Sequence, residues 1–255
     1  MGDRMKKCRT DLAVEEAPSD FVYDVDRTIH GMNLKKIYVD STLSKKIGKK
    51  EGYYYNLDNI DYFNKDKEII KILSIIINDV LASVKKLKSI LVIGLGNSFI
   101  TPDSLGPLVI NKIEVNNYFE DNPNIRLSAI SPGTMGQTGM ESSDITLAII
   151  KMFKPDLVII IDALACVSLD RMCHSIQAST AGINPGSGVG NHRKELSKDT
   201  LGVDVLAIGV PTVCDLNSLI DIGDDYFITP NNIDEAMDIL SYIISKAINK
   251  AIINK

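Results

Sequence analysis

Hydrophobic residues follow two spacings along the chain. From Lys65 onward they recur every three or four positions, which predicts an amphipathic helix through Ile69, Leu73, Ile76, Ile77, Val80 and Val84. Short segments at 89–93, 126–130, 156–162, 174–178 and 203–209 have the length of strands, and 157–161 is apolar throughout. Helical patterns lie between or after them, to about residue 113, at 142–153, and from Thr229-Pro230 toward the C-terminus. This alternation predicts an α/β fold built on a mostly parallel, doubly wound sheet.

The first 64 residues lack this regularity. They are polar, and we expect a flexible head followed by two or three short strands. The run 9–15, RTDLAVE, is unusual for a tail, although an edge strand or a helix cap also explains it. We therefore predict one domain, with a less regular part at 13–64 and an α/β core at 65–255.

Composition narrows the function classes. The chain has 255 residues, 45% of them hydrophobic, which suits one large domain. A net charge of -5 argues against nucleic acid as the main partner, and no apolar run approaches the roughly 20 residues of a membrane span. The N-terminus has no apolar signal region, and the four cysteines have no CxxC spacing. These features predict a cytosolic protein with reduced thiols.

Two aspartates stand where predicted parallel strands end. The run 89–93 enters a glycine turn and leaves through Thr101-Pro102-Asp103, and Asp162 closes the apolar run 157–161. A charge in such a place is costly unless it is paired or functional. Two neighbouring carboxylates can share a proton or a metal ion, and their repulsion yields one acid and one base near neutral pH. Asp103 is equally explained as a carboxylate at a helix N-terminus.

Other chemistry has weaker support. GLGNSF has Phe99 where a dinucleotide site needs its third glycine, and neither HExxH nor GxSxG is present. His30, His174 and His192 are scattered, so a metal site is underspecified. The glycine loops at 131–141 and 182–191 can present amides or hold a peptide backbone, although ordinary loop geometry explains them equally. Their candidate substrate-binding residues are Gly133, Gly136, Gly139, Gly186 and Gly188.

Six motifs occur in an order that resembles the spore germination proteases of endospore-forming bacteria. They are RTDLAVE (9–15), GLGN…TPDSLGP (94–107), PGTMGQTGME (132–141), KPDLVIIIDALA (154–165), GINPGSGVGN (182–191) and GVPTV (209–213). The resemblance implies a sheet like that of hydrogenase maturation proteases. It also implies an endopeptidase that starts the degradation of small acid-soluble spore proteins during germination.

The resemblance assigns roles to particular residues. The aspartates of the TPD and IDALA motifs fall on Asp103 and Asp162, which are then the catalytic pair. The family has been classed both as aspartic and as metallo-type; we expect a metal-free pair without a cofactor. Members are zymogens, and residues 10–15 have the hydroxyl, acid, apolar, small, variable, acid order of their cleavage sites. This predicts a propeptide of residues 1–12 and self-processing between Leu12 and Ala13.

The resemblance also implies a setting and leaves two alternatives. The substrates would be spore proteins, the location the cytoplasm of the forespore or spore core, and the assembly a homo-oligomer, a tetramer in the family, with no direct contact to nucleic acid or membrane. This chain is shorter than is usual for the family, and Cys166 and Cys214 depart from its pattern. The alternatives are a metal-binding maturation peptidase of the hydrogenase type and a non-catalytic α/β binding module.

Overall fold

The computed structural model describes residues 9–18, 20–118, 124–190, 193–220 and 226–252. The strands are β1 (Val25–Ile29), β2 (Met32–Val39), β3 (Gly52–Asp58), β4 (Ser89–Gly94), β5 (Arg126–Ile130), β6 (Leu157–Cys166), β7 (Ser175–Ser179), β8 (Asp204–Asp215) and β9 (Phe227–Ile228). The helices are α1 (Ala13–Glu16), α2 (Ser41–Ile47), α3 (Asp66–Ser83), α4 (Leu105–Ile110), α5 (Met135–Thr138), α6 (Ser142–Phe153), α7 (Lys198–Leu201) and α8 (Ile233–Ile252). Short 3₁₀ turns are η1 (Thr101–Asp103), η2 (Leu169–Arg171), η3 (Ser187–Val189) and η4 (Leu216–Ser218).

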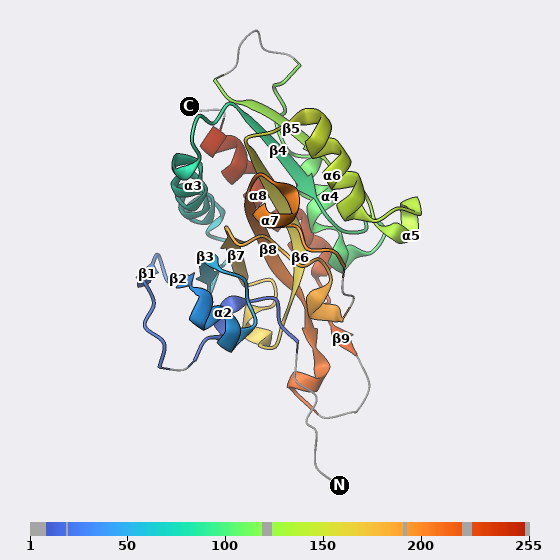
Figure 1. Cartoon of the computed structure of the whole chain (residues 1–255). Helices are drawn as coiled ribbons and strands as arrows, with labels where there is room; N and C mark the ends of the chain where they lie inside the picture. Colours follow the sequence, from blue (N-terminus) through green and yellow to red (C-terminus); the bar gives the residue numbers. More distant parts are fainter. Residues whose placement is uncertain (1–8, 19, 119–123, 191–192, 221–225, 253–255) are drawn as a thin grey trace.

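All described strands belong to one sheet with the order β1-β2-β3-β7-β8-β6-β4-β5, and β9 pairs with β8 (Figure 1). Strands β8, β6, β4 and β5 form a parallel core. Strands β7, β3, β2 and β1 continue the sheet in antiparallel pairs. The predicted α/β fold with a parallel core is confirmed, and the N-terminal strands are an extension of the same sheet.

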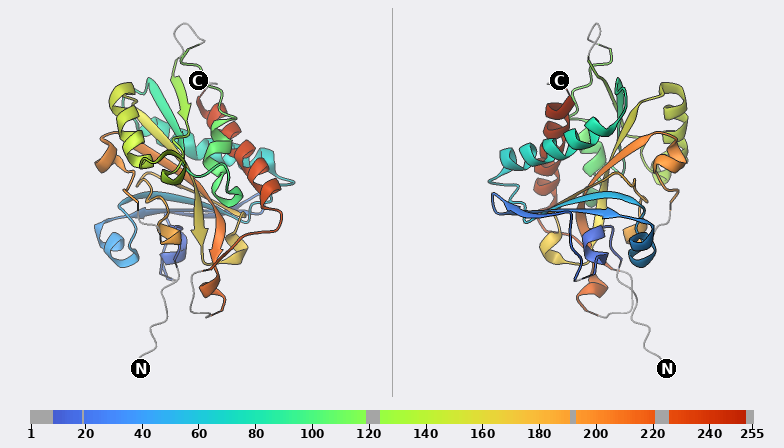
Figure 2. Two further views of the ribbon diagram at one scale, coloured as in Figure 1. Left: turned by 90° about the vertical axis from the view of Figure 1, so that its right-hand side faces the viewer. Right: turned by 60° about the vertical axis from the view of Figure 1, so that its left-hand side comes forward.

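Helices cover both faces of the parallel core, as a doubly wound sheet requires (Figure 2). On β4, Ile90 and Val92 pack into the cluster that contains α3, α4 and α8. The alternate residues Leu91 and Ile93 pack with Ile150 of α6 on the other face. Among the described helices, none combines the length and the apolar character that crossing a bilayer demands.

Several element boundaries test the sequence pattern. Strand β5 and helix α6 have the predicted bounds, and α3 ends one residue before the predicted Val84. Other bounds differ from the prediction. Strand β8 runs past Gly209 to Asp215, and α4 ends at Ile110 instead of about residue 113. Strand β6 continues past Asp162 to Cys166, because β8 keeps pairing with it. Helix α8 begins at Ile233 instead of at Pro230, and the Thr229 hydroxyl donates to the Thr212 carbonyl (2.8 Å).

Candidate active site

The glycine turn after β4 positions Asp103. A Cβ atom at Gly96 would collide with the Asp103 carbonyl oxygen, and Gly96 has a φ of +113°. Both features require glycine there. The Asn97 N–H donates to the Asp103 carboxylate (2.9 Å) and to its carbonyl (3.0 Å). The Asp103 carboxylate is therefore held by the turn that precedes it, through the Asn97 N–H.

Asp162 lies within β6 beside the end of β4. Gly94, the last residue of β4, pairs with Ile161, and Asp162 pairs on its other side with Gly209 of β8. The side chain is buried, and its Oδ1 accepts from the Ala163 N–H (3.0 Å). Our prediction that Asp162 closes its strand was wrong. It nevertheless stands at the carboxyl edge of the core, because β4 stops one residue earlier.

Asp103 is close enough to Asp162 for its charge to act on the ionisation of Asp162. Burial raises the pKa of Asp162 well above its ordinary value, and the negative charges of Asp103 and Asp11 raise it further. Burial also raises the pKa of Asp103, opposed by the Asn97 N–H and by the positive charge of Arg193. Arg193 opposes the pKa shift of Asp162 in the same way. The site thus favours one protonated and one ionised carboxyl group.

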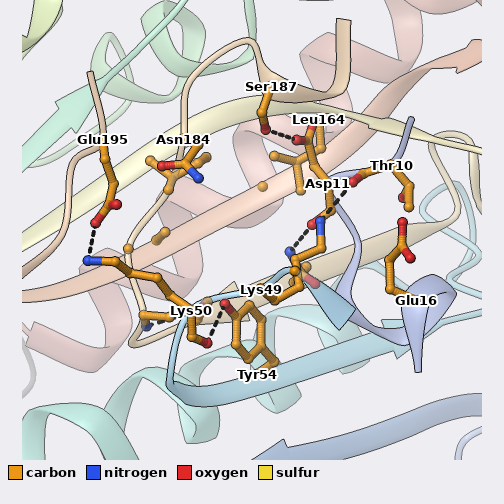
Figure 3. Close-up of a pocket in the computed structure, with 18 of the residues that line it drawn as sticks. Thr10, Asp11, Glu16, Lys49, Lys50, Tyr54, Leu164, Asn184, Ser187 and Glu195 are labelled. Carbon is orange, nitrogen blue, oxygen red and sulfur yellow. Dashed lines mark hydrogen bonds and ion pairs between the residues drawn. The ribbon is translucent and has the colours of Figure 1, made fainter. Parts of the chain in front are cut away.

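Asp11 is a third carboxylate of this site, and sequence reasoning missed it as a neighbour of the pair. Its Oδ2 accepts from the Ala165 N–H (2.9 Å), and its Oδ1 accepts from the Ser187 hydroxyl (2.6 Å), as Figure 3 shows for Ser187. The Asp11 N–H donates to the Ala165 carbonyl (3.0 Å). The signal that could have found Asp11 was its place in the unusual segment 9–15.

Residues 9–16, here called the head segment, are docked on the sheet instead of forming a flexible tail or an edge strand. Leu12 and Ala13 are both 0% exposed, so the predicted processing bond is enclosed. The Ala13 N–H donates to Gln177 Oε1 (2.8 Å), and Gln177 Nε2 donates to the Asp11 carbonyl (3.2 Å). Lys49 donates to the Thr10 carbonyl (2.7 Å; Figure 3). The expectation of a flexible head is wrong for residues 9–16, and whether the chain cuts itself between Leu12 and Ala13 stays a prediction.

A pocket of about 540 Å³ lies beside the head segment (Figure 3). Its lining includes Asp11 from the head segment, Lys50 just before β3, Tyr54 within β3, Asn184 from the second glycine loop, and Arg193. Neither Asp103 nor Asp162 lines this pocket. It adjoins the pair through Gly209, the strand partner of Asp162, and through Arg193, whose positive charge lowers the pKa values of both aspartates.

The two glycine loops lie in different surroundings. A Cβ atom at Gly188 would collide with the Asp11 carboxylate, and Gly186 adopts a φ of +74° where η3 begins. The loop at 182–190 therefore holds the chain's own head segment at close range. In the other loop, Gly133 and Gly139 have positive φ values at turns, and space around Gly136 is open. That loop does not line the pocket.

A metal ion would need several His, Cys, Asp or Glu side chains grouped around one point. Among the described residues, no group of three or more His, Cys, Asp or Glu side chains is arranged to hold a metal ion. His174 contacts the Ile60 carbonyl through Nδ1 (2.9 Å), and His192 lies outside the described residues. Asp11, the third carboxylate, already accepts hydrogen bonds from Ala165 and Ser187. Metal-free catalysis stays a prediction.

Comparison with known proteins places these residues in a family. The family profile described as germination protease matches residues 5–221. The chain belongs to the germination protease family. It is 40% identical to the germination protease of Geobacillus sp. (strain WCH70), covering 88% of this chain and 68% of that protein. It is 41% identical to the germination protease of Bacillus cytotoxicus, covering 86% and 66% respectively.

The chain spans about two thirds of the length of these germination proteases. A solved structure, the [NiFe] hydrogenase maturation protease HycI from Thermococcus kodakarensis KOD1, aligns with a TM-score of 0.41 and 20% identity. That alignment covers 68% of this chain and 99% of the other. Membership of the germination protease family rests on the sequence matches, which include the segments that carry Asp11, Asp103 and Asp162.

Proposed function

We propose that this chain is an endopeptidase that begins the degradation of small acid-soluble spore proteins, in the forespore or spore core. The observation that carries the proposal is the pair Asp103 and Asp162, two carboxyl groups with raised pKa values at the carboxyl edge of the parallel core. Family membership supports the reaction class, a peptide hydrolysis. We further propose that the protein works as a homo-oligomer and needs no metal.

The chemistry follows from the two ionisation states. Asp103, whose charge is supported by the Asn97 N–H and by Arg193, takes a proton from a water molecule. The water oxygen attacks the peptide carbonyl carbon. Asp162, which burial keeps protonated, gives its proton to the departing amine. One water is consumed, and the products are a new carboxyl terminus and a new amino terminus.

The decisive experiment compares cleavage of a purified acid-soluble spore protein by the wild type, Asp103→Asn and Asp162→Asn. Asparagine has nearly the same shape but cannot carry a proton through the cycle, so we expect turnover to fall at least about 100-fold in each variant. Circular dichroism should show the same fold. Near wild-type turnover in either variant would refute the pair, and inactivity of the wild type toward every spore protein would refute the function.

We also propose that the chain is a zymogen that cuts itself between Leu12 and Ala13. The head segment lies against the site, with Asp11 acting on the pKa of Asp162. Because both residues of the bond are enclosed, the head segment must shift before it is cut. Incubation at mildly acidic pH followed by N-terminal sequencing should give a chain that starts at Ala13. A different new terminus, or processing by Asp162→Asn protein free of other proteases, would contradict this proposal.

A further inference from the structure

Two buried cysteines face each other near the ends of β6 and β8, and the proposed reaction uses neither. Cys166 of β6 pairs with Cys214 of β8, and both side chains are 0% exposed. Directly paired residues of neighbouring strands present their side chains on the same face of the sheet. The two thiol groups are hydrogen-bonded to each other. Both cysteines are free thiols.

The spacing of the two strands fits a covalent bond between the sulfur atoms. Neighbouring strands lie about 4.8 Å apart, and disulfides join residues whose Cα atoms are about 4.4–6.8 Å apart. The register between β6 and β8 shifts between Leu164 and Ala165, next to the cysteine pair. An irregularity of this kind increases the local twist of the strands. The two Cβ atoms therefore need not keep the separation of a flat ladder.

The head segment covers this pair. Leu12 and Val14 pack with Cys166, Cys214 and Leu164 in one small apolar cluster. Leu12 is itself 0% exposed, so neither the sulfur atoms nor the side chain over them meets solvent. A dissolved oxidant therefore reaches the sulfur atoms only after the head segment has moved away.

The surroundings also keep both thiols protonated. Burial raises the pKa of each thiol, and the negative charge of Glu15 raises both pKa values further. Hydrogen bonds with Ser218 and Cys166 oppose the rise in the pKa of Cys214. The thiolate, not the thiol, is the reactive form of cysteine. Departure of the head segment removes the apolar cover and Glu15 together, so both pKa values fall and Cys214 ionises first.

We propose that Cys166 and Cys214 are a modification site, a pair of thiols that a peroxide oxidises to a disulfide once the head segment has left. The Cys214 thiolate attacks one oxygen of hydrogen peroxide, the O–O bond breaks, and a sulfenic acid and hydroxide form. The Cys166 thiolate then attacks the sulfenic sulfur and expels a second hydroxide. The two thiol protons convert the hydroxides to two waters, so the sulfur atoms lose two electrons and the peroxide gains them.

A third buried cysteine has different surroundings. Cys173 packs in the cluster that contains α3 and α8, and it is not part of the cluster with Leu12. Burial raises the pKa of its thiol to about 12. Departure of the head segment leaves that burial in place, so Cys173 stays reduced and serves as an internal control.

Hydrogen peroxide treatment of the full-length chain tests the site. All proteins carry Cys8→Ser, because Cys8 lies outside the described residues. Leu12→Ala shrinks the cover over the pair, and Gln177→Ala removes the two hydrogen bonds that Gln177 makes to the head segment. In both variants the disulfide should form at least about 10-fold faster than in the parent, because the head segment opens more often. Ile75→Ala, at an exposed position of α3, is the control and should react like the parent.

Mass spectrometry after alkylation of the remaining thiols identifies the product. We expect a linked pair of peptides containing Cys166 and Cys214, two hydrogens lighter than the separate peptides, and its reversal by dithiothreitol. Cys166→Ala should abolish the link, whereas Cys173→Ala should leave it intact. If Leu12→Ala fails to fold, Gln177→Ala still decides, since Gln177 lies outside the cysteine cluster. Absence of the linked peptides in the opened variants, linkage through Cys173, or equal rates in all proteins would overturn the proposal.

Melting temperature tests whether the disulfide fits the folded strands. Oxidised Gln177→Ala protein should melt at a higher temperature than the same sample after reduction, because the disulfide closes a loop over residues 167–213 and constrains the unfolded chain. With Cys166→Ala added, oxidation should give no such increase. A melting temperature that falls when the disulfide forms would overturn the proposal. Neither measurement requires peptide cleavage, so the outcome is independent of the proposed function.

Discussion

At the scale of single residues, Asp162 makes a pH-dependent contribution to stability. Its pKa in the folded chain is raised, by burial first and then by the charges of Asp103 and Asp11, above the value of 3.8 that the unfolded chain has. As pH rises above 3.8, the unfolded chain releases this proton before the folded chain does. Stability therefore falls through that window and stays lower above the folded-state pKa.

Asp162→Asn removes this loss, because asparagine cannot ionise and its side-chain oxygen can still accept from the Ala163 N–H. We predict a higher free energy of unfolding than the wild type at pH 7, with a gain that shrinks as pH falls toward 4. Urea denaturation at several pH values measures it. Asp199→Asn is the control. The Lys50 hydrogen bond lowers the pKa of Asp199, so removing this carboxylate should not raise the free energy of unfolding at pH 7. A gain of equal size at pH 4 and pH 7 would contradict the explanation.

At the scale of elements, the two glycine loops differ in the space that they leave for a side chain. A Cβ atom at Gly188 would meet the Asp11 carboxylate and the Ala165 side chain, whereas nothing surrounds that position at Gly136 in α5. We predict that Gly188→Ala lowers the free energy of unfolding by about 1–3 kcal/mol, as overpacking does. Gly136→Ala should leave it unchanged or raise it by up to about 1 kcal/mol.

Chemical denaturation measures both glycine variants, and limited proteolysis around residues 9–16 shows whether the head segment has been displaced. Equal losses in the two variants would mean that close contact with the head segment is not the reason for Gly188.

The helices and strands show which features could be predicted from the sequence and which could not. The bounds of α6 were predictable, since Lys154-Pro155 stops the helix. The bounds of β5 were also predicted, from the short run 126–130. The end of β6 was not, because its extension depends on pairing with β8, far along the chain. The two aspartates were found from their strands and motifs. Asp11 was not, because only tertiary contacts with Ala165 and Ser187 bring it to the site.

At the scale of the whole molecule, the sheet joins the N-terminal strands to the parallel core. Strand β3 pairs with β7 over five residue pairs, and β7 pairs with β8. Tyr55 and Leu57 of β3 also pack in the same hydrophobic cluster as α3 and α8. These contacts leave little apolar surface that either part could bury alone, so the two should unfold together.

We predict one cooperative unfolding transition. The chain has no tryptophan, and six of its nine tyrosines precede β4, at positions 23, 38, 53, 54, 55 and 62. Tyrosine fluorescence therefore reports mainly on the N-terminal strands, while far-ultraviolet circular dichroism reports on the helices of the core. The two urea midpoints should coincide. Tyrosine fluorescence that changes at a distinctly lower urea concentration would show that the strands β1–β3 unfold separately.

Because the head segment is part of the same chain as the groups that bind it, its concentration near those groups is high. Because residues 9–16 are joined to the sheet that binds them, they face their binding groups at an effective concentration on the order of millimolar, however dilute the protein is. A free peptide at micromolar concentration competes poorly with such a tethered ligand. Dilution cannot release the head segment, but a single cut within it would. The portion before the cut would then be a separate peptide that can diffuse away. Whether it occupies its binding groups would depend on its concentration in solution, as for any free ligand.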